Sequence, residues 1–510
     1  MRRAADALRG GPRPVSSPPV VAPSPHAVPL ADLLVDLPRA EVRGDPRTPV
    51  ADVTYRSDRA GPGSLFFCVP GTARDGHAFA AQAVARGASA LVVERWLEVD
   101  ATQALVPSVR EAMGPVAAAF FGRPAERMAV VGVTGTNGKT TTTYLLESIF
   151  REVGMTPGLI GTTGARIAGR PVPFDRTTPE APDLHRLLRA MADRGVSAVA
   201  MEASSHGLHQ HRVGGIRFAC AVFTNLSQDH LDYHGTMEAY FAAKARLFTP
   251  GMTERAAVNV DDPQGRRLLR SDVPVVTYGM GPEADLRAEE VETSAAGIAF
   301  RAGGVEVRSP LRGLFNVYNC LAALAAARAL GLDREAAARG IAAVGGVPGR
   351  VEPVEEGQPF LVLVDYAHTP DGIENVLRAA RPLVGEDGRL LVVFGAGGDR
   401  DRTKRPLMGR AATSLADLTV ITSDNPRSED PLAIIAQIEA GAREGGGAYE
   451  VEPDRRAAIR LAFSRAGEGD VVVIAGKGHE TGQEVGGRVI PFDDRVVARE
   501  ELRALRGGGP

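Results

Sequence analysis

Lysine is so rare in this chain that each lysine invites a chemical explanation. Among the 59 lysine and arginine residues of the 510-residue sequence, only four are lysines: Lys139, Lys244, Lys404 and Lys477. Arginine stays protonated in proteins, whereas a buried lysine can lose its proton and become a neutral amine. We therefore expect these four positions to need something that a guanidinium group does not supply.

The segment GVTGTNGKTT, residues 132–141, is the strongest local motif, since it follows the apolar run RMAVV and precedes a helical pattern. Backbone N–H groups of such a loop, together with the helix N-terminus behind it, bind phosphate oxygens. Lys139 would reach the terminal phosphates, and the Thr140 hydroxyl would bind Mg²⁺. The spacing departs from the usual P-loop, because Val133 stands where the first glycine belongs. The alternative is a glycine-rich turn without a ligand.

Two segments, 201–213 and 224–235, contain five of the ten histidines. We favour Mg²⁺ binding near the phosphate loop through Glu202 and His230. One alternative is zinc, although no cysteine pattern or HExxH motif accompanies the histidines. Its ligands would come from His206, His209, His211, His230 and His234. The other alternative is a structural role for polar residues at strand ends.

The segment EAYFAAKARLF, residues 238–248, has helical composition and places Lys244 on an apolar stripe. The apolar neighbours one turn away are Tyr240, Phe241, Leu247 and Phe248. The simple alternative is an amine that extends from the apolar face to water. A desolvated amine is instead neutral, and it can add CO₂ and release a proton to give a carbamate anion. The two carbamate oxygens could bind a hard cation.

Composition excludes several classes of protein. A net charge of −3 and ordinary contents of hydrophobic (44%) and charged (24%) residues argue against nucleic acid as the main partner. Cys68, Cys220 and Cys320 form no CxxC pair and suit a reducing cytoplasm. No apolar run has membrane-spanning length, so we expect no membrane insertion. Residues 1–28 are predicted to be a disordered tail, because they are rich in Pro and Ser.

Strand-like apolar runs alternate with helical patterns along the rest of the chain, which predicts α/β structure with parallel sheets. The length fits three domains, and we place them at 29–106, 107–349 and 350–510, with GGVPGRVE (345–352) as a linker. In the last domain the strand-like runs end in polar or glycine-rich motifs, where open α/β sheets bind ligands. These motifs are GAGGDRDRTKRP (395–406), TSDNPRSEDP (422–431) and AGKGHE (475–480).

Taken together, the motifs resemble those of the Mur ligase family over nearly the whole chain from about residue 50. The resemblance implies a small α/β UDP-binding domain, a P-loop ATPase-like central domain with a mostly parallel sheet, and a Rossmann-like C-terminal domain. It also implies a cytoplasmic, monomeric, ATP- and Mg²⁺-dependent ligase of peptidoglycan synthesis. The expected substrates are UDP-MurNAc-L-Ala-D-Glu, meso-diaminopimelate and ATP.

The same resemblance assigns site residues by motif. GTNGKTT, FNVYN, DYAHTP and the 395–406 segment provide the expected ATP contacts: Gly135, Thr136, Asn137, Gly138, Lys139, Thr140, Thr141, Asn316, Asp365, His368 and Lys404. The UDP-muramoyl dipeptide would contact Tyr55, Ser57, Thr72, Ala73, Arg74, Thr177, Thr178, Ser204, Gln210 and Arg212. Diaminopimelate would contact Arg400, Asp424, Asn425, Pro426, Arg427, Gly476 and Glu480. The expected metal ligands are Thr140, Glu202, His230 and carbamylated Lys244. The expected catalytic residues are Lys139, Glu202, His230 and Lys244.

The sequence departs from the family pattern in the first domain, where the usual Asp-Ser-Arg is replaced by Arg56-Ser57-Asp58. In the third domain, DNPR resembles the form that selects diaminopimelate, an amino acid that is lysine with an extra carboxylate. The guanidinium of Arg427 would bind that carboxylate through two parallel hydrogen bonds. A site of this kind can reject an analogue lacking the group by roughly 10⁴-fold.

The expected reaction begins with transfer of the ATP γ-phosphate to the D-glutamyl γ-carboxylate, and the diaminopimelate amine then attacks the acyl phosphate. Lys139 and Lys404 would offset charge on the transferring group. Alternatives within the same class are a lysine-adding Mur ligase and a folylpolyglutamate synthetase. The alternative of another class is a P-loop regulatory protein that couples nucleotide state to binding.

Overall fold

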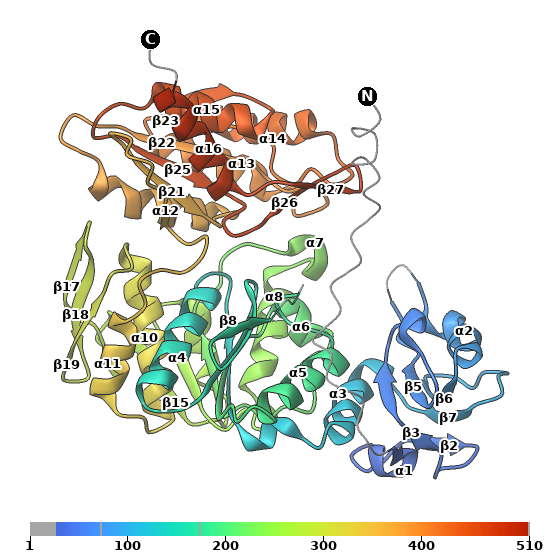
Figure 1. The fold of residues 1–510 in the computed structure, drawn as a ribbon. Helices are drawn as coiled ribbons and strands as arrows, with labels where there is room; N and C mark the ends of the chain where they lie inside the picture. Colours follow the sequence, from blue (N-terminus) through green and yellow to red (C-terminus); the bar gives the residue numbers. More distant parts are fainter. Residues whose placement is uncertain (1–26, 72–73, 173, 175, 508–510) are drawn as a thin grey trace.

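The computed structural model describes residues 27–71, 74–172, 174 and 176–507, which form three α/β units (Figure 1). The C-terminal unit sits above the central unit, and the N-terminal unit lies beside the central one. The predicted tail, residues 1–28, falls outside the described residues up to residue 26. Among the residues described, no helix is both long and apolar enough to cross a lipid bilayer.

The N-terminal unit is a five-stranded sheet covered on both faces. Its strands, in spatial order, are β2 (Glu41–Arg43), β7 (Thr102–Leu105), β6 (Ala88–Val93), β5 (Ser64–Phe67) and β4 (Asp52–Thr54). All neighbouring strands are parallel except β2 and β7. Helices α1 (Leu30–Leu33) and α3 (Val109–Phe120) pack on one face, and α2 (Ala80–Ala85) packs on the other.

The boundary predicted after residue 106 falls between β7 and α3, although α3 shares the hydrophobic cluster of the first sheet. A short pair of strands, β1 (Val28–Pro29) and β3 (Pro49–Val50), completes this unit. The domain limits stay a prediction.

A nine-stranded sheet forms the core of the central unit. Its spatial order is β11 (Arg170–Val172), β10 (Gly164–Ile167), β9 (Pro157–Gly161), β12 (Ala198–Glu202), β8 (Ala129–Thr134), β13 (Cys220–Phe223), β14 (Ala256–Asn259), β15 (Val275–Gly279) and β16 (Leu286–Arg287). The seven strands from β9 to β16 are parallel, and β10 and β11 are antiparallel additions. Successive residues of β8 point to opposite faces, so Val130 and Val131 enter different cores.

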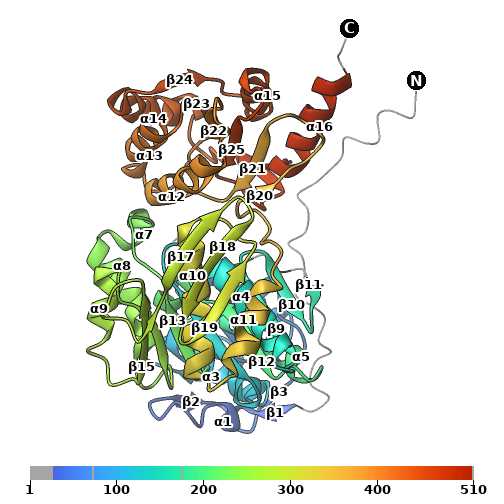
Figure 2. The same ribbon diagram turned by 90° about the vertical axis from the view of Figure 1, so that its left-hand side faces the viewer.

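Helices cover both faces of this sheet. On the Val131 face lie α4 (Lys139–Glu152), α10 (Leu314–Ala329) and α11 (Arg334–Ala342). On the opposite face lie α5 (Ala181–Ala192) and α8 (Met237–Ala245). The short helices are α6 (Ser205–His209), α7 (Leu231–His234) and α9 (Pro263–Leu268). An antiparallel sheet of β17 (Glu289–Ser294), β18 (Gly297–Ala302) and β19 (Val305–Ser309) lies outside α10 and α11 (Figure 2).

The C-terminal unit has a six-stranded sheet that is parallel except for its first strand. The order is β20 (Glu352–Pro353), β21 (Leu361–Asp365), β25 (Val471–Ala475), β22 (Leu390–Phe394), β23 (Leu418–Ile421) and β24 (Ala448–Val451). One face packs against α12 (Pro370–Ala380), α13 (Lys404–Leu415) and α14 (Pro431–Gly445). The other packs against α15 (Arg455–Arg465) and α16 (Asp494–Gly507).

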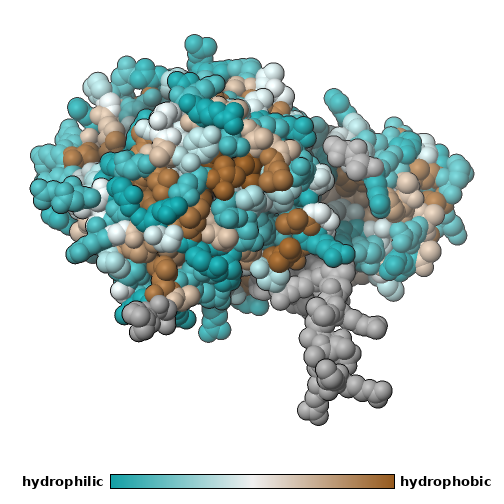
Figure 3. Space-filling model, turned by 90° about the horizontal axis from the view of Figure 1, so that it is seen from above, coloured by the Kyte–Doolittle hydropathy of each residue, from teal (hydrophilic) through white to brown (hydrophobic). Residues whose placement is uncertain are grey.

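A hairpin of β26 (Gly482–Val485) and β27 (Arg488–Pro491) follows β25. The view from above shows a C-terminal unit that is mostly hydrophilic, with apolar areas between polar ones (Figure 3). Val489 on β27 is the most exposed large apolar side chain among the described residues, at 73%.

The predicted fold class is confirmed: each unit is α/β, and the central and C-terminal sheets are mostly parallel. The helix predicted over 238–248 is α8, which ends at Ala245 and continues as a 3₁₀ turn through Phe248. Cys68, Cys220 and Cys320 are buried and form no disulfide.

Candidate active site

The phosphate loop connects β8 to α4, and its backbone requires glycine. Gly135 and Gly138 have φ angles of 151° and 86°. A Cβ atom on Gly135 would lie 1.8 Å from Thr224 Oγ1, and one on Gly138 would lie 2.3 Å from Asn319 Oδ1. The Thr224 hydroxyl donates to the carbonyl of Asn137 at 2.6 Å, which fixes the loop against β13. The glycines therefore allow close packing around the loop, in which the N–H groups of Thr136 and Asn137 donate to Asn225.

Two lysine amines meet at this loop. The Nζ atoms of Lys139 and Lys244 donate to the carbonyl of Gly135 at 2.9 and 2.7 Å, and Lys139 also donates to the carbonyl of Thr136. Lys244 is 1% exposed, and its Nζ lies 4.4 Å from the centroid of the Tyr240 ring. Burial, followed by repulsion from Lys139, lowers the pKa of Lys244 well below that of an exposed lysine. The amine therefore does not extend to water, and its lowered pKa favours the neutral form that carbamate formation requires.

Glu202, at the end of β12, lies beside Lys139 and Thr140. Its carboxylate is 1% exposed and accepts hydrogen bonds from the Thr140 hydroxyl and from the Thr162 backbone and hydroxyl groups, each at 2.9 Å. Oxygen donors next to a phosphate loop are the set that Mg²⁺ uses, and one or two protein ligands suffice because phosphates and water supply the rest. Glu202 and Thr140 thus fit the predicted metal.

Among the described residues there is no group of three or more His, Cys, Asp and Glu side chains suited to a metal. The zinc alternative therefore finds no support in this part of the chain. His206, His209 and His234 pack instead with Tyr233. Burial lowers the pKa of His230 to about 2, so its ring is neutral and retains a lone pair for a ligand.

Asp229, which was absent from the predicted site residues, joins the central and C-terminal units. It is 4% exposed, and its carboxylate lies 3.0 Å from Lys404 Nζ, 3.4 Å from His230 Nε2 and 3.6 Å from His368 Nε2. Burial alone would raise the pKa of Asp229, but His368 and Lys404 hold it well below its usual value. Lys404 is therefore placed by an ion pair between the two units.

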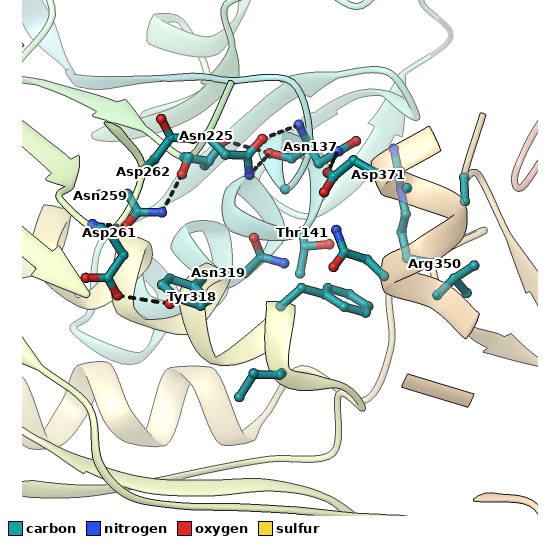
Figure 4. A pocket seen from close by; sticks show the side chains of 18 of the residues that line it. Asn137, Thr141, Asn225, Asn259, Asp261, Asp262, Tyr318, Asn319, Arg350 and Asp371 are labelled. Carbon is teal, nitrogen blue, oxygen red and sulfur yellow. Dashed lines mark hydrogen bonds between the residues drawn. The ribbon is translucent and has the colours of Figure 1, made fainter. Parts of the chain in front are cut away.

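A cavity of about 390 Å³ opens next to the phosphate loop (Figure 4). Asp261 lies at one end and accepts a hydrogen bond from the Tyr318 hydroxyl at 2.9 Å. At the other end the Asn137 amide donates to Asp371 of α12 at 2.7 Å. The cavity has the size and polarity for a nucleoside, and the loop lies at its rim.

The sequence prediction of Asn316 as a nucleotide contact is not supported by this cavity, which Asn316 does not line. The Asn316 amide donates to the carbonyl of Arg312, and its Oδ1 accepts from Asn319 one turn later. Residues three apart in a helix lie on the same side of it. Of these two asparagines, Asn319 is the one that contacts the phosphate loop, at Gly138. FNVYN contains both asparagines, and the role of Asn316 as a nucleotide contact stays a prediction.

The linker between the units also contributes to the site. Asp365 accepts hydrogen bonds from the backbone N–H groups of Val351 and Ala367, which ties the linker to the end of β21. Arg350 then reaches back, and its guanidinium donates to the Thr140 hydroxyl at 3.1 Å. The GGVPGRVE segment predicted this linker but gave no signal that Arg350 contacts the phosphate loop.

Four of the residues expected to bind the UDP-muramoyl dipeptide form one network. Thr178 accepts from the Ser204 N–H at 3.0 Å, and its carbonyl accepts from Arg212 at 3.0 Å. Arg212 also donates twice to Gln210 Oε1, at 3.0 and 2.6 Å. Thr177 is nearby, linked through its hydroxyl to Thr162 at 3.1 Å.

The remaining dipeptide-site residues lie in the N-terminal unit. Tyr55 donates to Asp183 of α5 at 2.8 Å, and Ser57 donates to Gln82 at 2.9 Å. The reversed pair Arg56–Asp58 forms a two-point contact at 3.0 and 2.6 Å. Arg74 is exposed, and Thr72 and Ala73 lie outside the described residues.

The C-terminal turn gathers the side chains predicted for amino-acid binding. The Asn425 amide donates to Glu480 at 2.9 Å, and Lys477 Nζ donates to both Asn425 Oδ1 at 3.0 Å and Glu480 at 3.3 Å. Lys477 is fully buried, so the fourth lysine also belongs to the site. Lys477 was given no role from the sequence, because the scarcity of lysine was the only signal that distinguished it.

Asp424 and Gly476 meet behind this cluster. Asp424 is 6% exposed, and its Oδ2 has no hydrogen-bond partner. A Cβ atom on Gly476 would lie 2.4 Å from that oxygen, which explains a glycine at this strand end. Pro426 completes the turn, and Arg400 is exposed beside it, with a charge that acts on His206 of the central unit. A buried carboxylate oxygen without a partner is suited to an ammonium group.

Comparison with known proteins identifies the family. Three family models match: "Mur ligase family, catalytic domain" over residues 49–125, "Mur ligase middle domain" over 133–327 and "Mur ligase, glutamate ligase domain" over 349–478. The UDP-N-acetylmuramoyl-L-alanyl-D-glutamate–2,6-diaminopimelate ligase of Geobacillus thermodenitrificans is 50% identical, with 94% of this chain and 100% of the relative covered. The Streptomyces coelicolor protein of the same name is 46% identical, with 98% and 99% covered.

A solved structure of a ligase of that name superimposes with a TM-score of 0.67 at 35% identity, with 94% of this chain and 99% of that chain covered. The phosphate loop, the buried Lys244 and the DNPR turn thus occur in a chain that matches these relatives over 94% and 98% of its length. By sequence and by structure, this chain belongs to the Mur ligase family.

Proposed function

We propose that this protein is the ATP-dependent ligase that joins meso-diaminopimelate to the γ-carboxylate of D-glutamate in UDP-MurNAc-L-Ala-D-Glu, during peptidoglycan synthesis. The observation that carries the proposal is the buried ion pair between Asp229 and Lys404, 3.0 Å apart. It joins the unit with the phosphate loop to the unit with the DNPR turn. ATP and the amino acid would therefore react in one shared site.

The first step transfers the γ-phosphoryl group of ATP to the substrate carboxylate. Lys139 and Lys404 would place positive charge around the phosphates, and the N–H groups at the start of α4 would orient them. Mg²⁺, held by Thr140, Glu202, His230 and carbamylated Lys244, would supply further charge neutralisation when bound. Thr178, Ser204, Gln210 and Arg212 would position the dipeptide, and the N-terminal unit would bind its uridine nucleotide.

The second step joins the amine of diaminopimelate to the acyl phosphate. The nitrogen lone pair attacks the carbonyl carbon, the tetrahedral intermediate expels inorganic phosphate, and the nitrogen loses a proton. Asp424 and Glu480 would bind ammonium groups of the amino acid, and Arg427 would bind its distal carboxylate. The reaction needs no enzyme nucleophile, because ATP supplies the leaving group.

The alternative functions would give different products in the same assay. A lysine-adding enzyme would prefer lysine, a folylpolyglutamate synthetase would not use a UDP-sugar peptide, and a regulatory protein would hydrolyse ATP without forming an amide. The contact between Tyr55 and Asp183 favours a ligase that uses the N-terminal unit, since it joins that unit to the edge of the central one.

Phosphate release with UDP-MurNAc-L-Ala-D-Glu, ATP and Mg²⁺ tests the proposal, with meso-diaminopimelate or L-lysine as the third substrate and mass spectrometry of the product. We expect phosphate and a UDP-tripeptide with diaminopimelate, and far less of both with lysine. Equal rates for the two amino acids, or phosphate release without an amide, would rule the proposal out.

A further inference from the structure

The hairpin β26–β27 forms one wall of the amino-acid turn. The Arg427 N–H donates to the carbonyl of Glu484 at 2.9 Å, and the Gly486 N–H donates to the carbonyl of Arg427 at 2.7 Å. The Glu484 N–H donates to Asn425 Oδ1 at 2.9 Å, and the Gln483 amide donates to the carbonyl of Asp424 at 2.6 Å. The backbone of Glu484 is therefore fixed on both sides relative to the turn.

The side chain of Glu484 faces the guanidinium of Arg427. Glu484 Oε2 lies 3.2 Å from Arg427 Nε, and Arg427 Nη1 donates to the carbonyl of Gly398 at 2.6 Å. The Arg427 backbone has a φ of 53°, a conformation uncommon for residues other than glycine, and the contacts with the hairpin hold it. The guanidinium is thus aimed at one place and already has a carboxylate there.

This arrangement bears on how a second carboxylate could bind. A guanidinium presents a carboxylate with pairs of neighbouring donors, and the pair that includes Nε faces Glu484. A substrate carboxylate that used this pair would take the position of the Glu484 carboxylate. The Glu484 side chain is 44% exposed, whereas that of Arg427 is 22% exposed. Once displaced, Glu484 can turn to water while its backbone stays in place.

We infer that Glu484 is a specificity-determining residue, an internal carboxylate that neutralises Arg427 until the distal carboxylate of the amino-acid substrate displaces it. The inference rests on the proposed function, in which Arg427 binds that carboxylate. In this inference the Glu484 carboxylate, which belongs to the enzyme itself, competes with the substrate carboxylate for the guanidinium of Arg427.

Two opposite consequences follow for the two amino acids. For diaminopimelate, Glu484 is a rival anion, so its charge weakens binding of the substrate. Lysine lacks the second carboxylate and ends in an ammonium group there. Glu484 offsets the positive charge of Arg427, so the repulsion between Arg427 and this ammonium group is weaker and lysine binds more readily. The same side chain therefore lowers selectivity from both directions.

The decisive variant is Glu484→Gln, which keeps the backbone contacts and the size of the side chain but removes its charge. We expect the KM for diaminopimelate to fall about two- to fivefold, because a partly exposed ion pair is a weak competitor. We expect ligation of lysine to fall by at least about twofold, because Arg427 then repels its ammonium group. Thermal shift with diaminopimelate alone should give a larger stabilisation of the variant than of the wild type.

Glu450→Gln is the matched control, since Glu450 also pairs with an arginine, Arg465 at 3.0 Å, on the same unit but away from the turn. It should leave both amino acids unaffected. A rise in the KM for diaminopimelate in Glu484→Gln, or a parallel loss with both amino acids, would overturn the inference and assign the residue a structural role. If the wild type itself showed no preference for diaminopimelate, the proposed function would fail first, and the inference with it.

Discussion

The phosphate loop and the amino-acid turn bind charged groups in opposite ways. At the loop, Lys244 and Glu202 are each 1% exposed, and they contact the Gly135 carbonyl of the loop and the Thr140 hydroxyl of α4. At the turn, Arg427 is partly exposed, and its partner Glu484 comes from a hairpin outside the sheet. The groups proposed to act on ATP are thus buried in the central unit, while the proposed selection of the amino acid involves a hairpin outside the C-terminal sheet.

The lysines separate the two regions further. Lys139 and Lys244 donate to one carbonyl oxygen, that of Gly135, in a space where a planar guanidinium with five donors would leave several unpaired. Lys404 and Lys477 each lie in a buried position with specific acceptors. Arg350 and Arg427 likewise link separate elements, the linker with α4 and the turn with the β26–β27 hairpin.

The largest effect should come from removing the amine at the phosphate loop. We expect Lys244→Ala to reduce turnover by about 10³-fold, the order seen when a group that stabilises transition-state charge is lost. A short carboxylic acid should restore part of the activity, because it supplies the missing anion in the cavity left by the side chain.

Lys244→Arg is the matched control, since it fills the position with a long basic side chain that stays protonated and cannot form a carbamate. We expect it to be as inactive as the alanine variant, with no rescue by the acid. Phosphate release measures both. Normal turnover of either variant would remove the contrast between a catalytic loop and a selective turn.

The next effect concerns the turn. We expect Arg427→Gln to reduce the preference for diaminopimelate over lysine by about 100-fold, because a hydrogen-bonded charge is worth roughly 1.5–3 kcal/mol. This is smaller than the 10⁴-fold expected for an unpaired buried group, since Glu484 already satisfies Arg427 when lysine binds.

Competition between the two amino acids in one reaction, with product masses counted, measures that preference directly. The KM for ATP should be unaltered in Arg427→Gln. A variant that loses ATP affinity as strongly as amino-acid selectivity would show that the two regions are not separate.

Two glycine variants test whether the phosphate loop and the amino-acid turn are separate sites, and we expect each to change one KM value by about tenfold. Gly138→Ala and Gly476→Ala each force a side chain into a backbone with positive φ, 86° and 119°, and against an oxygen at 2.3 and 2.4 Å. The left-handed conformation alone disfavours alanine by about 1–2 kcal/mol. We expect the first variant to raise the KM for ATP and the second to raise the KM for the amino acid. Equal changes in both KM values would contradict the division.

The smallest effect is on stability. Because burial lowers the pKa of Lys244, the unfolded chain binds more protons at this position than the folded chain does between the folded and unfolded pKa values. The free energy of unfolding therefore rises with pH up to the pKa of an exposed lysine, by at most about 1.4 kcal/mol per pH unit. Lys244→Met lacks this contribution, so its advantage in Tm over the wild type should shrink between pH 7 and pH 9.5. Thermal unfolding in CO₂-free buffer measures the difference, and a constant difference would mean that Lys244 is charged when folded.

Much of the loop region was predictable from the sequence. The run from Met128 to Thr141 predicted strand, glycine loop and helix, and these elements are present. The apolar neighbours of Lys244 predicted its burial, because a helix brings residues one turn apart to one face. Such local periodicities are set by backbone geometry, so they can be read without knowing the tertiary structure.

The contacts between distant elements were not predictable in the same way. Asp229 was passed over because its partners Lys404 and His368 lie in another unit, more than 130 residues along the chain. The contact of Asn319 with the loop at Gly138 was not predicted, because the motif does not show which asparagine faces the loop. The amino-acid sequence of the 482–491 hairpin contains no pattern that predicts a contact between Glu484 and Arg427.

The sequence by itself determined the α/β class, the phosphate loop, the burial of the Lys244 amine and the residues available for chemistry, since these depend on local spacing and on the side chains themselves. Only the tertiary structure decided which charges pair and which donors remain free. Those outcomes depend on how units fold over one another, and electrostatic energies change steeply with distances that no linear pattern records.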